Sequence, residues 1–547
     1  MRRVLFTLCL SFTIPVFAAN VSDNHALDSL TAAELGGHIK VLSSDAFGGR
    51  APASPGETKT IDYLRSQFKA FGLKPGWHGS FFQPVPMTEI TGAPADITIN
   101  GRKHVTTLKY LQDEVVLTER EQPTVTLKES PVVFVGYGID APEFHWNDFA
   151  GTDVRGKTIV VLVNDPGYAN PKLFRGKDMT YYGRWTYKYE EAARQGAAAV
   201  LVVHQTGPAG YGWGVIQNSN TGTKFTLTEP DHNRHRAAIE GWISESAAAA
   251  LFKQAGLDFT RLEQAADQPG FKAVPLNLDV SVTLHSKIAH ITTHNVIAML
   301  PGVSHPHQAV IYSAHWDHFG THPELTGDKV FNGAVDDGTG DAALLSIAKA
   351  FTLLRPHPQR SVMFLATTSE EQGLLGAAYY VRHPVLPLAD TVADINMDIM
   401  NVYGRTRDLT VIGYGRSQLE DALKVAAADE GMTITPDPNP ETGLYYRADH
   451  FEFAKRGVPA ILTFSGYAYV KRPAGWGQQT WNEYFAHHYH KPADEYDPNW
   501  DLSGLVQQTR ALFRLGDGLA DSAFWPDWYP DVPFKKPRDS SKAARTN

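Results

Sequence analysis

Apolar residues recur along the chain with two spacings, which separate helices from strands. Ile61, Leu64, Phe68 and Phe71 are three or four residues apart, so the spacing predicts an amphipathic helix that ends at Gly72. Between about residues 130 and 284, short β-branched runs lie between glycine turns, and the helical segment YKYEEAARQG precedes the last of them. This second block is expected to be a compact α/β or β-rich module.

A third block, from about residue 293 to 523, alternates apolar strands with amphipathic helices. The predicted strands span residues 309–313, 361–366, 391–396, 409–412 and 460–464. Alternation of this kind favours a mostly parallel sheet with helices on both faces, so the predicted fold class is α/β. Polar clusters directly follow most of these strands, and open α/β sheets place their sites at the carboxyl ends of strands. The chemistry of the chain is therefore expected there.

The two ends of the chain differ from the rest in composition. Two arginines precede an apolar run of about a dozen residues that ends in Val16-Phe17-Ala18. The run is shorter than the roughly 20 residues of a spanning helix, and no later run reaches that length, so no membrane span is expected. Residues 1–18 are thus predicted to be a cleaved signal peptide, with a buried helix or a membrane anchor as the alternative. The basic segment 531–547 offers little to bury and is expected to be disordered.

Net charge and cysteine content limit the partners and the disulfides that the protein can have. The net charge is -9, and without the two arginines of residues 1–18 it becomes 48 minus 59, or -11. Because neither sign forms a long run outside the basic tail, nucleic acid is excluded as a partner. Cys9, the only cysteine, lies in the predicted signal peptide. A periplasmic or secreted product would therefore depend on its core without disulfides.

Five polar segments in the third block offer carboxylates or imidazoles: SAHWDHFG, FNGAVDDGTGDAALL, TTSEEQGLLGA, INMDIMN and HHYHKPADEYD. A hydrolytic zinc ion needs three protein ligands and an open position for water. A second zinc ion about 3.5–4 Å away needs a carboxylate that both metals share. Five ligands in these segments suffice for the pair. Taken singly, each segment also fits a turn, a helix cap or acids in a first helical turn.

The five segments resemble, in order, the motifs of the co-catalytic dizinc peptidases, which include bacterial leucyl aminopeptidases, glutamate carboxypeptidase and the non-enzymatic transferrin receptor. The motifs are His315-Trp316-Asp317, Gly333 to Gly340, Glu370-Glu371, Asn396 to Asp398 and His490 to Asp494. Residues 126–286 resemble the protease-associated domain that is inserted in some of these proteins. The resemblance implies an N-terminal part of the peptidase domain over 19–125 and a catalytic domain over 287–530. Five coincidences in this order are improbable for surface residues.

The resemblance implies a role for each residue. Two Zn²⁺ ions per chain are expected, one held by His315 and Asp398, the other by Glu371 and His490, with Asp336 as the bridge. Asp317 is expected to accept the other ring N–H of His315 and so fix its tautomer. Glu370 is expected to be the general base. Tyr445, with Tyr446 as a rival, is expected to donate to the oxyanion. His318 and the remaining histidines are expected to be solvated.

The predicted function is an exported aminopeptidase that acts on peptide substrates. A carboxypeptidase or dipeptidase with the same dizinc centre is the alternative, and it would need arginine for the terminal carboxylate, for which Arg405, Arg407 and Arg447 are candidates. A catalytically silent, receptor-like protein would need lost ligands, and none is lost. A glutaminyl cyclase would hold a single zinc ion. The sequence does not indicate the oligomeric state.

Overall fold

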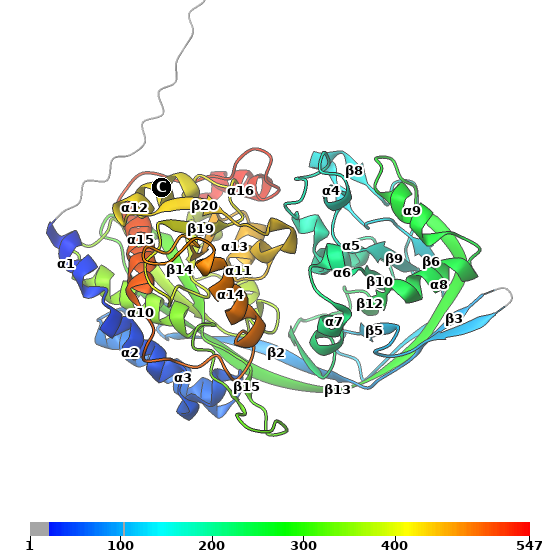
Figure 1. Cartoon of the computed structure of the whole chain (residues 1–547), viewed down its shortest axis with the longest axis horizontal. Helices are drawn as coiled ribbons and strands as arrows, with labels where there is room; N and C mark the ends of the chain where they lie inside the picture. The colour runs from blue at the N-terminus through cyan, green and yellow to red at the C-terminus, as the bar shows by residue number, and fades with distance from the viewer. Residues whose placement is uncertain (1–20, 102–103, 547) are drawn as a thin grey trace, which may run out of the picture.

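The computed structural model describes residues 21–101 and 104–546. The predicted signal peptide, residues 1–18, lies outside the described residues. Two lobes lie side by side and are joined by two long strands, β2 (Phe82–Gly92) and β13 (Val274–Leu300) (Figure 1). Within the described part of the chain, no helix is long and apolar enough to cross a membrane.

The first lobe is built on a mixed sheet. Neighbouring strands pair in the order β20, β19, β21, β18, β14, β17, β13, β2 and β11. The strands β21, β18, β14 and β17 are parallel to one another. The bounds are β1 (Lys74–Pro75), β11 (Thr223–Leu227), β14 (His305–His315), β15 (Gly320–Thr321), β16 (Val330–Phe331), β17 (Arg360–Thr367), β18 (Thr391–Asn396), β19 (Asp408–Ile412), β20 (Thr433–Pro436) and β21 (Ala460–Ser465).

Helices cover both faces of this sheet, because its central strands are apolar on both sides. Along β14, Val310 and Tyr312 belong to the larger core, which α10 and α15 cover. Ile311 between them belongs to a smaller core on the opposite face, with Tyr380 of α11 and Phe453 of α13. The helices of this lobe are α1 (Val21–Ser29), α2 (Ala32–Leu42), α3 (Pro55–Ala70), α10 (Gly338–Leu353), α11 (Leu375–Arg382), α12 (Leu419–Asp429), α13 (His450–Lys455), α14 (Trp476–His487), α15 (Ser503–Ala520) and α16 (Lys535–Ser541).

The fold class predicted from the sequence is confirmed. Each of the five strands expected in the third block is present, and the largest difference from the expected bounds is at β14, which begins four residues earlier. The predicted N-terminal helix is α3, and its stripe Ile61, Leu64 and Phe68 is buried. Gly72 follows the helix with a φ of +83°, a conformation that favours glycine.

The second lobe has a sheet of its own. β13 pairs with β6, and the parallel strands β6, β9, β10 and β12 follow, with β5 antiparallel at the end. The bounds are β3 (Ile97–Asn100), β4 (Val105–Leu108), β5 (Glu114–Leu117), β6 (Thr124–Phe134), β7 (Asp140–Ala141), β8 (Trp146–Asn147), β9 (Thr158–Leu162), β10 (Ala199–His204) and β12 (Ile239–Ser244), and the helices are α4 (Pro166–Ala169), α5 (Trp185–Arg194), α6 (Thr206–Ala209), α7 (Trp213–Ser219), α8 (Glu245–Gln254) and α9 (Phe259–Ala266).

The second lobe begins earlier in the chain than the predicted boundary at residue 126. Ile97, Ile99 and Leu108 belong to the same buried core as Leu201 of β10. β3 pairs with β13, and β5 pairs with β12, so these early strands are part of the lobe. The boundary was missed because β3, β4 and β5 are each four residues long, too short for a clear alternating pattern.

The expected disorder of residues 531–547 is wrong for the part that the structure describes. Residues Lys535–Ser541 form α16, and the Arg538 side chain is fully buried. Its guanidinium donates to the carbonyls of Thr391 and Val392 at 3.1 and 3.4 Å. Asp527 accepts hydrogen bonds from Lys535 and Lys542. The basic residues thus have acidic and carbonyl partners on the first lobe, which composition alone did not reveal.

Arg50 links the segments that lead to the first two motifs. Its fully buried guanidinium donates to the carbonyls of Trp316, Asn332 and Gly333 at 2.8, 2.5 and 2.9 Å. A fourth bond, of 3.1 Å, reaches Leu42 at the end of α2. One side chain therefore holds the loop after β14 and the loop before α10 in a fixed relation.

Replacing Arg50 with methionine is expected to destabilise the fold by about 3–4 kcal/mol, because four buried carbonyls lose their donor. Chemical denaturation followed by tryptophan fluorescence measures the change. The matched variant Arg65→Met removes an arginine that is about half exposed in its ion pair with Asp62, so it is expected to change stability by less than about 1 kcal/mol. Equal effects of the two variants would contradict this role of Arg50.

Candidate metal centre

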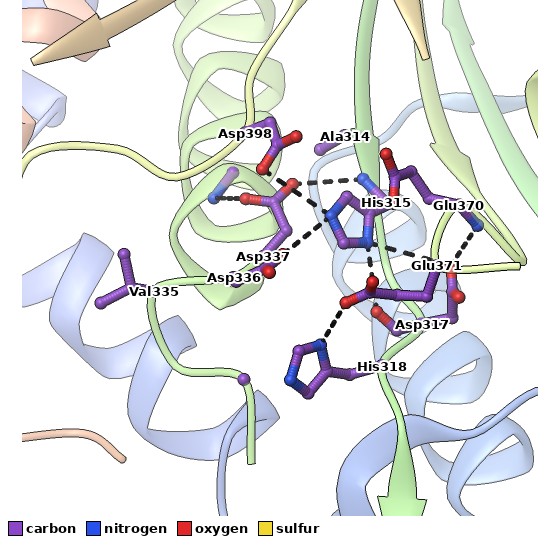
Figure 2. A network of polar contacts seen from close by, with 12 residues as sticks. Ala314, His315, Asp317, His318, Val335, Asp336, Asp337, Glu370, Glu371 and Asp398 are labelled. Carbon is purple, nitrogen blue, oxygen red and sulfur yellow. Dashed lines mark hydrogen bonds and ion pairs between the residues drawn. The ribbon is translucent and has the colours of Figure 1, made fainter. Parts of the chain in front are cut away.

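The five predicted ligands come from loops at one edge of the first sheet. His315 is the last residue of β14, Glu371 follows β17, and Asp398 follows β18. Asp336 lies just before α10, and His490 follows α14. Because β14, β17 and β18 are parallel, their carboxyl ends meet at this edge. Figure 2 shows the four of these side chains that it labels, His315, Asp336, Glu371 and Asp398, gathered around one space.

Asp336 is at the centre of the group. Its Oδ1 lies 3.1 Å from Nε2 of His315, and its Oδ2 lies 3.2 Å from Nε2 of His490. Asp398 Oδ1 is 3.8 Å from the same His315 nitrogen, and Glu371 Oε2 is 3.2 Å from the same His490 nitrogen. The structure thus brings the five residues together as two histidine–carboxylate pairs on either side of one carboxylate.

The charges in this group depend strongly on one another. Burial would raise the pKa of Asp336, but hydrogen bonds to His315 and His490 outweigh burial and hold the pKa well below its usual value. Burial would lower the pKa of His315, but the charge of Glu370 and the nearby carboxylates of Asp336 and Asp398 raise it well above the usual value. Burial raises the pKa of Asp398. This concentration of buried carboxylates needs positive charge for compensation.

The unpartnered atoms of the group fit divalent metal ions. Asp398 Oδ1 and Glu371 Oε1 are buried, and neither accepts a well-aligned hydrogen bond within the described part of the chain, although His315 Nε2 lies 3.8 Å from the first and His318 Nδ1 lies 2.7 Å from the second. Two groups with no residue in common each have ligand atoms within 4.8 Å of one another: His315, Asp337 and Asp398, and His318, Asp336 and Glu371. The centre therefore contains two candidate metal sites, and their carboxylate and imidazole donors suit zinc.

These two groups include Asp337 and His318, which were not among the predicted ligands. Asp337 accepts hydrogen bonds from the backbone N–H groups of Gly340 and His315 at 2.8 and 3.2 Å. Since both of its oxygens are engaged, it acts as the N-cap of α10, and Asp336 is the better ligand. His318 was expected to be solvated, which is wrong: it is fully buried, and its Nδ1 lies 2.7 Å from Glu371 Oε1. Burial lowers its pKa, against the opposing effect of Glu371.

Asp317 differs from its predicted role. His315 Nδ1 lies 3.1 Å from the backbone carbonyl of Asp317, whereas the Asp317 carboxylate is 3.9 Å away. The carbonyl therefore accepts the ring N–H and leaves Nε2 of His315 free for a metal. The carboxylate instead accepts the backbone N–H of Glu370 at 3.0 Å. Burial raises the pKa of Asp317 to about 8. Asp317 thus positions both His315 and Glu370, through different atoms.

Asp494 holds Asp336 in place from the other side. Its carboxylate accepts the backbone N–H groups of Val335 and Asp336, each at 3.1 Å, and the hydroxyl of Tyr484 at 3.2 Å. The sequence interpretation used Asp494 only as the end of the last motif. Its contacts show that it fixes the central carboxylate of the group.

A cavity of about 400 Å³ opens from this centre and reaches the second lobe. Glu370 lines it beside Asp336, Asp398 and His490. Burial raises the pKa of Glu370 well above its usual value, and Glu371 and Asp398 add to the shift against the opposing effect of His315. Glu370 is therefore a carboxyl group with raised proton affinity beside the candidate metal sites, as a general base requires.

Neither tyrosine predicted to stabilise the oxyanion has its hydroxyl group at the centre. Tyr445 does not line the cavity; its ring packs between Arg416, His450 and Phe534. Tyr446 lines the cavity, but its hydroxyl donates to the carbonyl of Met179 at 3.0 Å. The contacts therefore support neither prediction: the Tyr445 hydroxyl has no hydrogen-bond partner in the described part of the chain, and the Tyr446 hydroxyl is bound to Met179.

Tyr489 is a tyrosine beside the candidate metal centre that the sequence interpretation did not single out. It lines the cavity, and its ring stacks on His490 with a centroid distance of 3.7 Å. Burial raises the pKa of its hydroxyl well above the usual value, and the charges of Asp336 and Glu371 add to the shift. The hydroxyl therefore stays protonated and able to donate. Its place next to His490 in the sequence was the signal that could have identified it.

The model of Peptidase family M28 matches residues 295–513, which include all five predicted ligands. We refer to this segment, which is similar to that family, as the M28 segment. The M28 segment begins within β13, after the second lobe has been completed.

Curated relatives of the chain carry aminopeptidase names. Aminopeptidase NAALADL1 of Mus musculus is 33% identical over 139 residues, which are 24% of this chain and 17% of that protein. Probable leucine aminopeptidase 2 of Arthroderma benhamiae is 29% identical over 206 residues, 36% of this chain and 38% of that protein. The chain thus spans well under half the length of these two relatives. A protein of the latter name from Aspergillus fumigatus is 24% identical over 436 residues, 78% of this chain and 69% of that protein.

The fold of the whole chain also has a solved counterpart. The structure of an aminopeptidase from Aneurinibacillus sp. strain AM-1 superimposes with a TM-score of 0.50 at 18% sequence identity. The superposition covers 92% of this chain and 97% of that chain. The fold of this chain is therefore similar to that of a solved structure over most of its length.

Proposed function

We propose that the protein is a dizinc aminopeptidase that hydrolyses N-terminal residues from peptides. The observation that carries the proposal is the central position of Asp336, whose two oxygens face His315 and His490. A carboxylate in this position suits two metal ions that share one ligand. His315 and Asp398 would hold one zinc ion, and Glu371 and His490 the other. The aminopeptidase names of the relatives support the choice of reaction.

The zinc ions and the side chains of the chain have different roles in the proposed reaction. Two zinc ions, when bound, would polarise the scissile carbonyl and acidify the attacking water. Glu370 takes the proton of that water and passes it to the leaving amine. The Asp317 carboxylate keeps Glu370 in place by accepting a hydrogen bond from the backbone N–H of Glu370. The Tyr489 hydroxyl donates a hydrogen bond to the carbonyl oxygen as its negative charge develops.

The position of the arginines bears on which end of the peptide is trimmed. Arg405 and Arg407 do not line the cavity, and their guanidinium groups donate to backbone carbonyls elsewhere. Arg447 does line the cavity, so the carboxypeptidase alternative rests on this residue.

Peptides with free and with acetylated N-termini distinguish the two reactions. The aminopeptidase proposal expects cleavage of leucine p-nitroanilide and of free-N-terminal peptides, with loss of activity when the N-terminus is acetylated. Cleavage of only the blocked peptides would overturn it in favour of a carboxypeptidase. No cleavage with full metal content would favour the silent, receptor-like class. Metal analysis of the same sample separates the glutaminyl cyclase, which would hold one zinc ion per chain.

Tyr489→Phe is expected to lower kcat by about 10²–10³-fold, because one donor to the oxyanion is lost. Metal content should stay unchanged, since the phenol is not one of the ligands. Tyr445→Phe is the matched control and is expected to leave kcat within about twofold of the wild type, because Tyr445 does not line the cavity. Steady-state kinetics with leucine p-nitroanilide measures both. A larger loss in Tyr445→Phe than in Tyr489→Phe would return the role to Tyr445.

Two further proposals concern the rest of the chain. The second lobe is proposed to be a protease-associated domain, supported by the resemblance of residues 126–286. Export to the periplasm or medium is proposed from residues 1–18. N-terminal sequencing of the protein from its own cells would test export, and a mature chain that still begins at Met1 would contradict it.

A further inference from the structure

Arg184 is a buried cation without a partner on the wall of the cavity. It lies at the N-terminus of α5 in the second lobe and lines the cavity that holds the metal centre. It is 8% exposed, and its Nε has no hydrogen-bond partner. Within residues 21–101 and 104–546, its guanidinium is in no hydrogen bond or ion pair. Burying an arginine in this state is costly unless another group supplies the missing acceptor.

A second unpaired arginine faces the same space from the first lobe. Arg447 lines the cavity, forms no ion pair in the described part of the chain, and donates only to the carbonyl of Thr442 at 3.0 Å. Burial lowers the pKa of Arg184 to about 10, and the charge of Arg447 adds to this effect. The two cations are therefore close enough to repel each other, which is a cost that an anion between them would remove.

The other cations of the cavity wall are neutralised by neighbouring acids. Arg382 pairs with Glu229, and Lys455 pairs with Glu452 at 2.9 Å and with Glu190 at 3.4 Å. Arg184 and Arg447 differ from them in having no such acid. The N-terminus of α5 adds to the positive potential, because its first turn contains no acidic residue. Arg184 and Arg447 thus leave positive charge without an acidic partner on the wall of the cavity that the metal centre also lines.

We propose that Arg184 and Arg447 form a subsite for a carboxylate of the peptide substrate, which selects short peptides with a free C-terminus. This inference rests on the proposed aminopeptidase function. The N-terminal residue would lie at the metal centre and the carboxylate would lie between the two lobes. A guanidinium group donates two parallel hydrogen bonds to a carboxylate, which gives directional as well as electrostatic recognition. An acidic side chain near the scissile bond offers the same chemistry.

The test compares peptides that differ only in this carboxylate. For the wild type, kcat/KM for Leu-Gly-Gly is expected to exceed that for Leu-Gly-Gly-amide by about tenfold or more, because a hydrogen-bonded charge pair is lost in the amide. In Arg184→Gln and in Arg447→Gln the ratio is expected to fall towards one. Arg184→Lys keeps the charge without the planar fork and is expected to keep part of the preference.

Matched measurements make the result interpretable. Arg382→Gln removes an arginine of the same wall that already has an acid partner, and it should keep the wild-type ratio of acid to amide. If Leu-Asp-Gly-amide is preferred to Leu-Asn-Gly-amide, the side chain is the source of the carboxylate. Equal rates for acid and amide and for Asp and Asn peptides in the wild type would overturn the subsite, even if Arg184→Gln fails to fold. Absence of cleavage of every free-N-terminal peptide would instead overturn the proposed function.

Discussion

Glu370→Gln is expected to lower kcat by about 10²–10⁴-fold while the metal content stays near two ions per chain. Glutamine is nearly isosteric but cannot take a proton from water. The residue lines the cavity beside the ligands, and Asp317 holds its backbone through a 3.0 Å hydrogen bond that the substitution leaves in place. Steady-state kinetics with leucine p-nitroanilide and inductively coupled plasma mass spectrometry on the same preparation measure the two quantities.

Glu483→Gln is the matched control for this experiment. Glu483 is an exposed residue of α14, paired with His487 at 3.3 Å and outside the cavity lining. It is expected to leave both kcat and metal content unchanged. Normal turnover in Glu370→Gln would remove this residue from the mechanism. Loss of metal in that variant would make Glu370 a ligand instead.

Asp336→Ala is expected to reduce the metal content from about two ions per chain to near zero and activity to background, because both ions lose their shared ligand. The geometric reason is that the two Asp336 oxygens contact different histidines, His315 and His490. Metal analysis after gel filtration without added zinc measures the content. Asp521→Ala, at an exposed position at the end of α15, is the control that should retain both ions.

Retention of one metal ion by Asp336→Ala would contradict the bridging role. His315, Asp337 and Asp398 also lie close enough to hold a single ion. If that group were the true site, removing Asp336 would spare it. The number of metal ions that this variant binds therefore decides between the two ligand sets, because the distances alone are compatible with both.

The strands and the strand-end ligands could be predicted because they depend on local pattern. β14 and β17 are apolar on both faces, and a polar residue that follows a buried strand lies at the carboxyl end of the sheet by geometry alone. The positions of His315 and Asp398 follow from this rule. The order of the motifs supplied the remaining residues.

Side-chain direction and burial could not be predicted in the same way. Asp317 orients His315 through its carbonyl, and Tyr445 packs away from the cavity, because the rotation of short loops is set by tertiary contacts. His318 is buried in the loop that Arg50 holds. Arg50 donates to the carbonyl of Trp316, which lies 266 residues later in the chain. Arg184 reaches the cavity from the other lobe, so no spacing within the third block could reveal it.

β13 has a consequence for any attempt to study the M28 segment alone. The strand is shared: its first part pairs with β6 of the second lobe, and its last part pairs with β2 and β17 of the first. β2 is covered on its other side by β11, which the chain reaches only after passing through most of the second lobe. Excising residues 93–285 would therefore uncover the backbone of β2 from Met87 to Thr91 and create an open sheet edge, which is a template for aggregation. The second lobe thus also protects the solubility of the lobe that carries the metal centre.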